Sequence, residues 1–304
     1  MIKRVLITGA NAGLGKESAK QLAYQHGIEK VYLGCRNPEK ALIAKQELER
    51  LTGKQIFEIL LIDVSDTDSV HKAVELLPEP IDALVMNAGG SGGKNFNQMT
   101  RDGVTQIFAV NLLGHAVLTE QLIKAGKLKQ IALYAGSEAA RGVEGMGMKR
   151  PKLDTSSIDE FVSICNGSFY GETNDATVPY GPIKYMAALW MAAMARQHPD
   201  IRFITMSPGG TTGTEGFDTL SPIRQYTMKS MMKVMLWLGK VHPVEVGAKR
   251  YIDGLFNKKY QSGGFYASKK GLTGPVGEQG AIFEDINNKN FQENAYHAIK
   301  RFMG

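Results

Sequence analysis

Short apolar runs recur along the chain, and each precedes a stretch in which apolar positions repeat at the spacing of a helix. Such runs predict strands that are buried on both faces, because a strand with one face in water alternates apolar and polar side chains. They lie at residues 5–7, 31–33, 59–62, 83–86, 131–134 and 203–206. Strands that alternate with helices predict a parallel, doubly wound sheet with helices on both faces, which is a three-layer α/β/α fold.

Two segments interrupt this alternation, residues 141–176 and residues 210–245. Neither has the composition of a linker, so we expect a single domain over residues 1–304 with both segments inserted into it. The second segment is rich in methionine and predicts either a flexible apolar cover for a lipophilic substrate or an amphipathic helix that packs on the fold. Its apolar residues include Met228, Met231, Met232, Met235, Leu236 and Trp237.

Composition excludes several classes of protein. The 304 residues are 43% hydrophobic and 22% charged, as in soluble globular proteins. The net charge of +6 comes from basic residues scattered among acidic ones, which predicts a solvated surface and no nucleic-acid partner. Cys35 and Cys165 give neither a disulfide framework nor metal-ligand spacing, so we expect a cytoplasmic protein without a metal. No apolar run reaches the ~18 residues of a bilayer span, so we expect no membrane span.

A glycine-rich stretch follows the first apolar run and reads Thr-Gly-Ala-Asn-Ala-Gly-Leu-Gly at residues 8–15. In a doubly wound sheet, ligands bind at the carboxyl ends of the strands. Glycines there let the backbone approach a pyrophosphate, and the next helix offers its unpaired N–H groups. The alternative is that the stretch only caps that helix. The expected cofactor contacts are Gly9, Asn11, Gly13, Leu14 and Gly15.

The end of the second run indicates which dinucleotide binds. A carboxylate at this place would bind the ribose hydroxyls of NAD, whereas a cation accommodates the phosphate of NADP. The chain has Cys35 where the acid would stand, and Arg36 follows with a guanidinium suited to phosphate. The residues therefore favour NADP(H). The alternative is that Arg36 begins a loop and pairs with Glu39.

Further polar motifs follow the later runs. They are Asp63-Val64, Asn87-Ala88-Gly89, Asn111, Ser137, Tyr180-x-x-x-Lys184 and Pro208-Gly209. Together with the glycine-rich stretch, their order resembles that of the short-chain dehydrogenase/reductase family over residues 2–210. Within that family the chain resembles the NADP-preferring retinol dehydrogenase and protochlorophyllide reductase-like members, which have an insertion before the catalytic tyrosine. The resemblance implies a Rossmann-type domain that binds NADP(H) along these motifs.

The resemblance also implies hydride transfer between nicotinamide and a carbonyl or alcohol carbon. Ser137 would hold the substrate oxygen, and Tyr180 would deliver or remove its proton. Lys184 would bind the ribose and tune the phenol, and Asn111 would support a water-linked proton path. Asp63 would contact the adenine. The structural alternatives are a turn residue at Ser137, a helix kink at Asn111 and a plain turn at Asn87-Ala88-Gly89. Asp63 could instead cap the next helix, which is compatible with the adenine contact.

The Tyr-x-x-x-Lys motif is repeated, so its spacing alone does not identify the catalytic pair. The pairs are Tyr180 with Lys184, Tyr266 with Lys270, and Tyr296 with Lys300. Tyr180 alone falls between the fifth and sixth runs and opens an apolar helix, whereas the others lie in a late strand and a terminal helix. The i, i+4 spacing places Lys184 beside Tyr180, where its ammonium would lower the pKa of the phenol. Pro182 requires the helix to begin close to Tyr180.

Residues 141–176 separate Ser137 from Tyr180, so both ends of the segment are tied to the catalytic side of the sheet. Its polar and glycine content predicts a mobile lid over the substrate, with little apolar surface to bury. Cys165 within it is expected to be an inert apolar filler, since no histidine with a supporting acid stands beside it.

Three classes of function follow from these residues: an oxidoreductase, a catalytically silent NADP-binding sensor, and a structural subunit with a vestigial site. The complete set of Ser137, Tyr180 and Lys184 favours the enzyme. The expected partner is a small carbonyl or alcohol compound, lipophilic if the methionine-rich segment covers it. The sequence leaves a homo-oligomer open.

Overall fold

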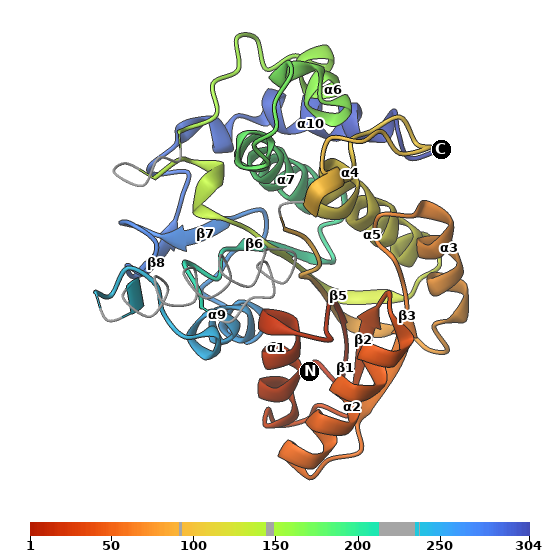
Figure 1. The fold of residues 1–304 in the computed structure, drawn as a ribbon. Coiled ribbons are helices and arrows are strands. Elements are labelled where there is room, and N and C mark those ends of the chain that lie inside the picture. The colour runs from red at the N-terminus through yellow and green to blue at the C-terminus, as the bar shows by residue number, and fades with distance from the viewer. Residues whose placement is uncertain (91–92, 144–148, 213–234, 237) are drawn as a thin grey trace.

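The computed structural model describes residues 1–90, 93–143, 149–212, 235–236 and 238–304. Its strands form one eight-stranded sheet in the order β3-β2-β1-β4-β5-β6-β7-β8, with helices on both sides (Figure 1). The predicted parallel, doubly wound sheet is therefore confirmed. The six predicted strands are β1 (Arg4–Thr8), β2 (Lys30–Cys35), β3 (Phe57–Leu61), β4 (Ile81–Met86), β5 (Leu128–Ala135) and β6 (Arg202–Met206).

Two further strands extend the sheet beyond β6. β7 (Phe265–Ser268) pairs parallel with β6, and β8 (Val276–Glu278) pairs antiparallel with β7. β8 has three residues, all half-buried, so it lacks the apolar run that would predict a strand from the sequence.

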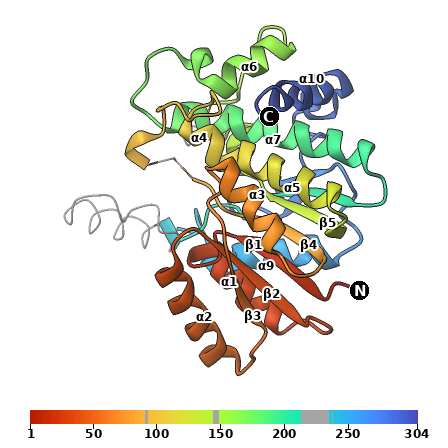
Figure 2. The ribbon, with the colours of Figure 1, turned by 90° about the vertical axis from the view of Figure 1, so that its right-hand side faces the viewer.

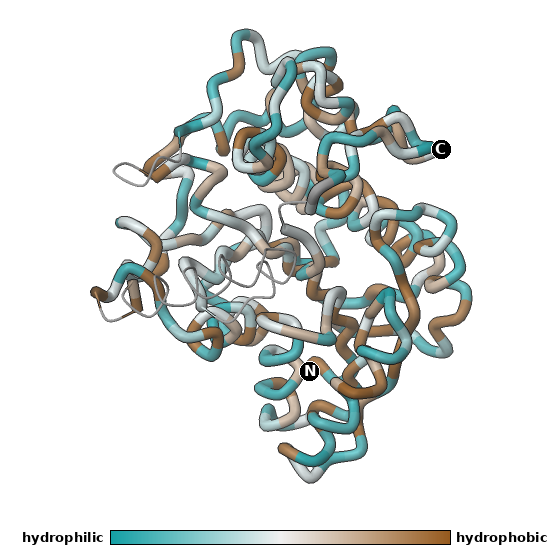
Figure 3. The backbone as a smooth tube through the Cα atoms, viewed as in Figure 1, coloured by the Kyte–Doolittle hydropathy of each residue, from teal (hydrophilic) through white to brown (hydrophobic). Residues whose placement is uncertain are grey.

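Two buried apolar clusters lie on opposite faces of the sheet. One packs α1 (Gly13–Ala23), α2 (Pro38–Thr52) and α9 (Val244–Phe256) against the strands. The other packs α3 (Thr67–Leu76), α5 (Gly114–Lys124) and α7 (Thr177–Gln197). Figure 2 shows these two layers from the side. In Figure 3 apolar segments run through the sheet, whereas the outer helices mix apolar and polar positions, as the predicted patterning requires.

The remaining helices lie at the edges of these layers. α6 (Ile158–Asn166) and α10 (Lys289–Lys300) pack on each other and on α7. The short helices are α4 (Gln106–Phe108), the π-helix η2 (Ala109–Leu113), and the 3-10 helices η1 (Gly93–Asn95), η3 (Glu138–Ala140), η4 (Ser168–Tyr170) and η5 (Glu284–Asn287). Within the described ranges, no helix is long and apolar enough to cross a membrane.

The expectation that residues 141–176 bury little apolar surface is wrong. The segment contains α6, whose Phe161, Ile164 and Cys165 are fully buried in the cluster with α7 and α10. Their spacing of three and four residues places them on one face of the helix, so the glycine and polar content of the segment concealed a core element. Cys165 lies in this core, and burial raises the pKa of its thiol, in agreement with an inert filler.

Most of the methionine-rich part of segment 210–245 lies outside the described residues, which omit 213–234 and 237. The alternatives of an apolar cover and a packed helix therefore concern residues outside the described ranges. Met235 and Leu236 are helical, and Leu236 is exposed.

Gly114→Ala is expected to lower the free energy of unfolding by about 1–3 kcal/mol through overpacking. A Cβ at Gly114 would stand 1.6 Å from the carbonyl oxygen of Val64, so α5 would have to move away from the loop after β3. Urea unfolding measures the change. Gly247→Ala on α9 is the control, because its Cβ would first meet the movable side-chain ends of Thr211 and Leu14. An equal or larger loss at Gly247 would mean that the close approach of Gly114 to Val64 does not set the cost.

Candidate active site

A cleft of about 670 Å³ opens at the carboxyl ends of the strands. The structure brings most of the predicted site residues together around it, and Gly15 and Asn111 are the two that do not line it. The predicted residues that line the cleft are Gly9, Asn11, Gly13, Leu14, Arg36, Asp63, Val64, Asn87, Ala88, Gly89, Ser137, Tyr180, Lys184, Pro208 and Gly209.

The glycine-rich loop forms one wall of the cleft. Gly9 has φ +65°, and a Cβ there would stand 3.0 Å from the Cα of Ala88, so a side chain would not fit. A Cβ at Gly15 would lie 2.3 Å from the carbonyl oxygen of Gly9, so Gly15 allows α1 to approach the loop from behind. Ala12 precedes α1 and has no side-chain acceptor to cap it, which leaves the first N–H groups for an anion.

The end of β2 places two cations at the same cleft. Arg36 and Lys40 both line it, at the start of α2, where Asn37 caps the helix by accepting from the N–H of Lys40 at 2.8 Å. Burial raises the pKa of the Cys35 thiol to about 11, so it brings no negative charge there. Among the ion pairs of the described residues, none joins Arg36 to Glu39. Two cations and a helix N-terminus fit a phosphate group.

Lys40 was not predicted as a site residue. It follows Arg36 by four positions, one turn along the first part of α2. Two cations spaced by four residues at the end of a strand could have predicted Lys40 as a second phosphate contact.

Asp63 lines the cleft but does not cap α3. Its carboxylate accepts from the N–H of Ser65 at 2.9 Å and from the Ser65 hydroxyl at 2.7 Å, which closes a local turn. Asp66 caps α3 by accepting from the N–H of Asp68. The cap alternative for Asp63 is therefore wrong, and its contact with an adenine stays a prediction.

Asn111 holds the loop that follows β4. Its side-chain nitrogen donates to the carbonyl oxygens of Gly90 at 2.8 Å and Ile107 at 2.9 Å, and its side-chain oxygen accepts from the N–H of Gly90. Asn111 lies in the π-helix η2, where the regular α-helical hydrogen bonding is interrupted, in agreement with the alternative of a helix kink. Its part in a proton path stays a prediction.

His115 was missed by the sequence analysis and ties the cofactor loop to this turn. Its Nε2 lies 2.9 Å from the Thr8 hydroxyl, and its Nδ1 lies 3.2 Å from the carbonyl oxygen of Asn111. The Thr8 hydroxyl in turn accepts from the N–H groups of Asn87 and Ala88. Burial lowers the pKa of His115 to about 3, so the ring is neutral, with Nδ1 donating to Asn111 and Nε2 accepting from Thr8. The only sign of this role in the sequence is a histidine within an otherwise apolar helix.

Ser137, Tyr180 and Lys184 converge at the end of β5, where all three line the cleft. Burial raises the pKa of the Tyr180 phenol, and a hydrogen bond with the Ser137 side chain opposes this rise. The expected lowering of this pKa is therefore wrong for the protein without cofactor, because burial outweighs the favourable neighbours. Burial also lowers the pKa of Lys184 to about 7. The Lys184 Nζ lies 5.5 Å from the centre of the Tyr180 ring, as the i, i+4 spacing predicted.

α7 begins at Thr177, three residues before Tyr180. The sequence predicts Pro182 in the first turn of the helix, but the structure places it in the second turn. Gly181 beside it brings α7 close to η3, since a Cβ there would stand 3.0 Å from the carbonyl oxygen of Ala139. This contact places Tyr180 against the Ser137 turn.

The other two Tyr-x-x-x-Lys motifs do not line the cleft. Tyr266 lies in β7, and its hydroxyl accepts from the N–H of Gln261 at 2.8 Å. Tyr296 lies on α10, where the ammonium of Lys300 is 6.0 Å from its ring centre.

A buried polar cluster supports the turn at Pro208-Gly209. The Glu138 carboxylate accepts from the Ser207 hydroxyl at 2.6 Å and from the N–H of Ser268 at 2.9 Å. Arg250 lies 3.7 Å from the same carboxylate and donates to the Ser268 hydroxyl. The Ser207 hydroxyl accepts from the N–H of Gly209 at 3.0 Å. The cluster thus joins the Ser137 turn, β6 and β7, and only Glu138, directly after Ser137, gave a hint of it in the sequence.

Comparison with known proteins agrees with this arrangement. The family model for short chain dehydrogenase matches residues 3–132. Dehydrogenase/reductase SDR family member 12 of Bos taurus is 31% identical over 210 residues, which are 67% of this chain and 59% of that protein. Retinol dehydrogenase 11 of Homo sapiens is 41% identical over 133 residues, which are 43% of this chain and 40% of that protein. The chain spans less than two thirds of the length of both relatives.

The crystal structure of L-sorbose reductase from Gluconobacter frateurii has the same fold, with a TM-score of 0.64, 15% sequence identity, and coverage of 89% of this chain and 96% of that chain. The sheet and the cleft at its strand ends are those of a doubly wound α/β domain that binds a ligand where the strands end. The chain belongs to the short-chain dehydrogenase/reductase family and resembles its retinol dehydrogenase-like members.

Proposed function

We propose that the protein is an NADP(H)-dependent oxidoreductase that interconverts a carbonyl compound and its alcohol. The observation that carries this proposal is the layout of one cleft. Arg36 and Lys40 lie at the end of β2, and Ser137, Tyr180 and Lys184 lie at the end of β5. The glycine-rich loop runs between them, so a dinucleotide that follows the cleft has its phosphate at the cations and its nicotinamide at Tyr180.

The residues of the chain would hold the cofactor and manage the proton. NADP(H), when bound, supplies or accepts the hydride. Ser137 would donate a hydrogen bond to the substrate oxygen, and Tyr180 would give a proton to that oxygen in reduction or take it in oxidation. Lys184 would hold the ribose hydroxyls and keep a positive charge below the phenol. The alternatives of a silent sensor and a structural subunit instead predict cofactor binding without turnover.

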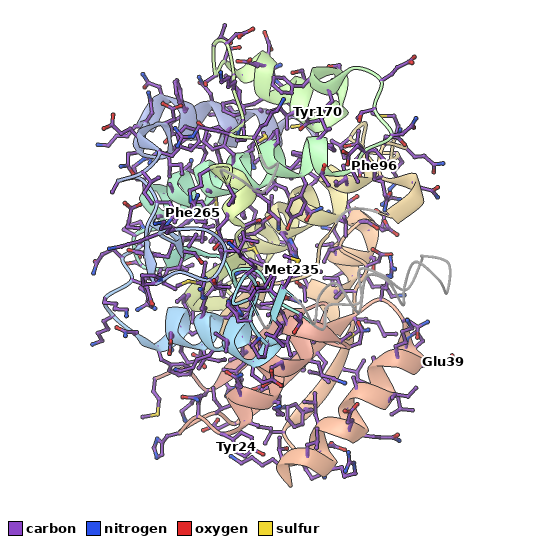
Figure 4. All side chains as sticks on the ribbon, turned by 60° about the vertical axis from the view of Figure 1, so that its left-hand side comes forward. Tyr24, Glu39, Phe96, Tyr170, Met235 and Phe265 are labelled. Carbon is purple, nitrogen blue, oxygen red and sulfur yellow. The ribbon has the colours of Figure 1, made fainter. Side chains whose placement is uncertain are left out.

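We infer that the substrate lies beside this cleft, in a second cavity of about 510 Å³ that part of segment 141–176 lines. This cavity lies beside the start of α7, with Pro179, the neighbour of Tyr180, in its lining. Phe96 and Tyr170 also line it, and Figure 4 shows that they come from separate segments on the same side of the molecule. A cytoplasmic location stays a prediction.

NADPH is expected to bind about 10- to 100-fold more tightly than NADH, because the contacts of a charged phosphate contribute about 1.5–3 kcal/mol. Arg36→Asp should abolish this preference, since it removes the cation and places a carboxylate at the end of β2. Quenching of protein fluorescence by each cofactor gives the dissociation constants.

Arg50→Asp is the matched control, because it makes the same charge change at the exposed far end of α2. It should leave the preference unchanged. Equal dissociation constants for the two cofactors in the unaltered protein would exclude the proposed NADP(H) dependence.

A further inference from the structure

The ammonium of Lys184 is hydrogen-bonded to Tyr134, a residue that belongs neither to the motifs nor to the proposed mechanism. Lys184 Nζ donates to the Tyr134 hydroxyl at 3.2 Å and to the carbonyl oxygen of Ala135 at 2.9 Å. The Tyr134 hydroxyl donates in turn to the carbonyl oxygen of Asn111 at 2.6 Å. Tyr134 thus accepts on one side and donates on the other, so both polar functions of its hydroxyl are used.

These groups lie in the dry interior of the protein. Lys184 is 4% exposed, and Tyr134 and Asn111 are 0% exposed. The ammonium also lies 4.7 Å from the centre of the Tyr134 ring, a distance at which the ring face attracts a cation. Tyr134 therefore contacts Lys184 both through its hydroxyl and through its ring.

In the described part of the chain, no carboxylate pairs directly with this buried charge. Among the ion pairs of the described ranges, none includes Lys184, and the carboxylate of Glu138 is occupied by Ser207 and Arg250. Burial lowers the pKa of Lys184 to about 7, so its charge near neutrality depends on the acceptors around it. Among the described residues, the titratable groups that interact electrostatically within this cluster are Tyr180 on α7, neutral His115 on α5, Tyr251 on α9 and Glu138 in η3.

We propose that Tyr134 is a positioning residue that holds the charged form of Lys184 beneath Tyr180, through the hydrogen-bonded chain from Lys184 to Tyr134 to the carbonyl group of Asn111. Without the Tyr134 hydroxyl, the ammonium has one acceptor fewer in a site that excludes water. The neutral amine is then favoured at a lower pH, and Tyr180 loses the neighbouring positive charge. Only the expected effect on the pH dependence of the reaction rate rests on the proposed function.

Tyr134→Phe tests this directly, since Phe keeps the ring in place and removes only the hydroxyl. The Cε carbon of ¹³C-labelled lysine reports titration in the cofactor-free protein by NMR, and Lys184→Arg assigns the resonance by its disappearance. The pKa of Lys184 is expected to fall by about one to two units in Tyr134→Phe, the effect of one hydrogen bond to a charged group. With NADPH and a carbonyl substrate, the alkaline limb of the pH–rate profile should move to lower pH by a similar amount.

Tyr32→Phe is the matched control. Tyr32 is 1% exposed, and its hydroxyl donates to Glu79, so the variant also removes a buried tyrosine hydroxyl but leaves Lys184 untouched. An unchanged Lys184 titration in folded Tyr134→Phe, or an equal shift in Tyr32→Phe, overturns the inference. If the wild-type protein neither binds NADPH nor reduces a carbonyl, the proposed function fails, and the NMR titration still decides the role of Tyr134.

Discussion

Tyr180→Phe is expected to lower the turnover number by about 10²–10⁴-fold, the usual contribution of a positioned acid or base. Phe fills the same space in the cleft, and Lys184 keeps its bonds to Tyr134 and Ala135, so the variant loses a proton donor and little structure. NADPH binding should change less than about threefold, since the rest of the cofactor cleft is unaltered. Stopped-flow oxidation of NADPH with a panel of carbonyl substrates measures the turnover, and fluorescence titration measures binding.

The other two tyrosines with a lysine four residues later are the controls. Tyr266→Phe removes a hydroxyl that accepts from the N–H of Gln261, and Tyr296→Phe alters the surface of α10. Both variants should keep their turnover. A folded control variant as inactive as Tyr180→Phe would mean that Tyr180 is not the acid and base.

Phe161→Ala is expected to lower the free energy of unfolding by about 3–5 kcal/mol, the usual cost of removing a buried aromatic ring. Phe161 is 0% exposed and belongs to the apolar cluster that joins α6 to α7 and α10. For the same reason, replacing residues 141–176 by a short turn should prevent folding, because it would also remove Arg141, whose guanidinium donates to Gln279 and to the carbonyl oxygen of Ser268. Urea unfolding followed by circular dichroism measures both effects.

Val162→Ala on the same helix is the matched control, since Val162 is half-buried, and it should cost clearly less than Phe161→Ala. A shortened protein that folds with wild-type stability would show that α6 is an independent appendage, contrary to its buried face.

The strands β1, β2, β4, β5 and β6 were predictable because each contains a buried apolar run, which is visible in the sequence as consecutive apolar residues. The edge strand β3 is apolar in sequence but only partly buried. The cofactor cleft was predictable for a related reason, since a parallel sheet brings the residues after each strand to one edge. Gly9, Asn87 and Tyr180 are far apart in the chain and line the same cleft. The face of α6 was also visible in principle at Phe161 and Cys165, but the polar content of its surroundings outweighed it.

The remaining features depend on contacts between distant side chains, which no local pattern encodes. In the sequence, Tyr134 is one apolar strand residue among others, and only the packing of α7 on the sheet places its hydroxyl beside Lys184. Glu138 and Arg250 are more than a hundred positions apart and meet through the tertiary fold. The burial that raises the pKa of Tyr180 is likewise a property of the assembled protein.

The docking of α10 on α6 and α7 bears on how the protein is made. On the ribosome, the first β-α units emerge together with their neighbours and can pair as they appear. α10 packs on α7 and contributes Ala295 and Ile299 to the same apolar cluster, and Arg196 at the end of α7 pairs with Glu293 at 2.5 Å. These residues are translated roughly a hundred positions after α7, so α7 cannot complete its packing until they have emerged. A nascent chain stalled before α10 should therefore have largely formed β-α units and an uncovered apolar helix, α7, that chaperones can bind.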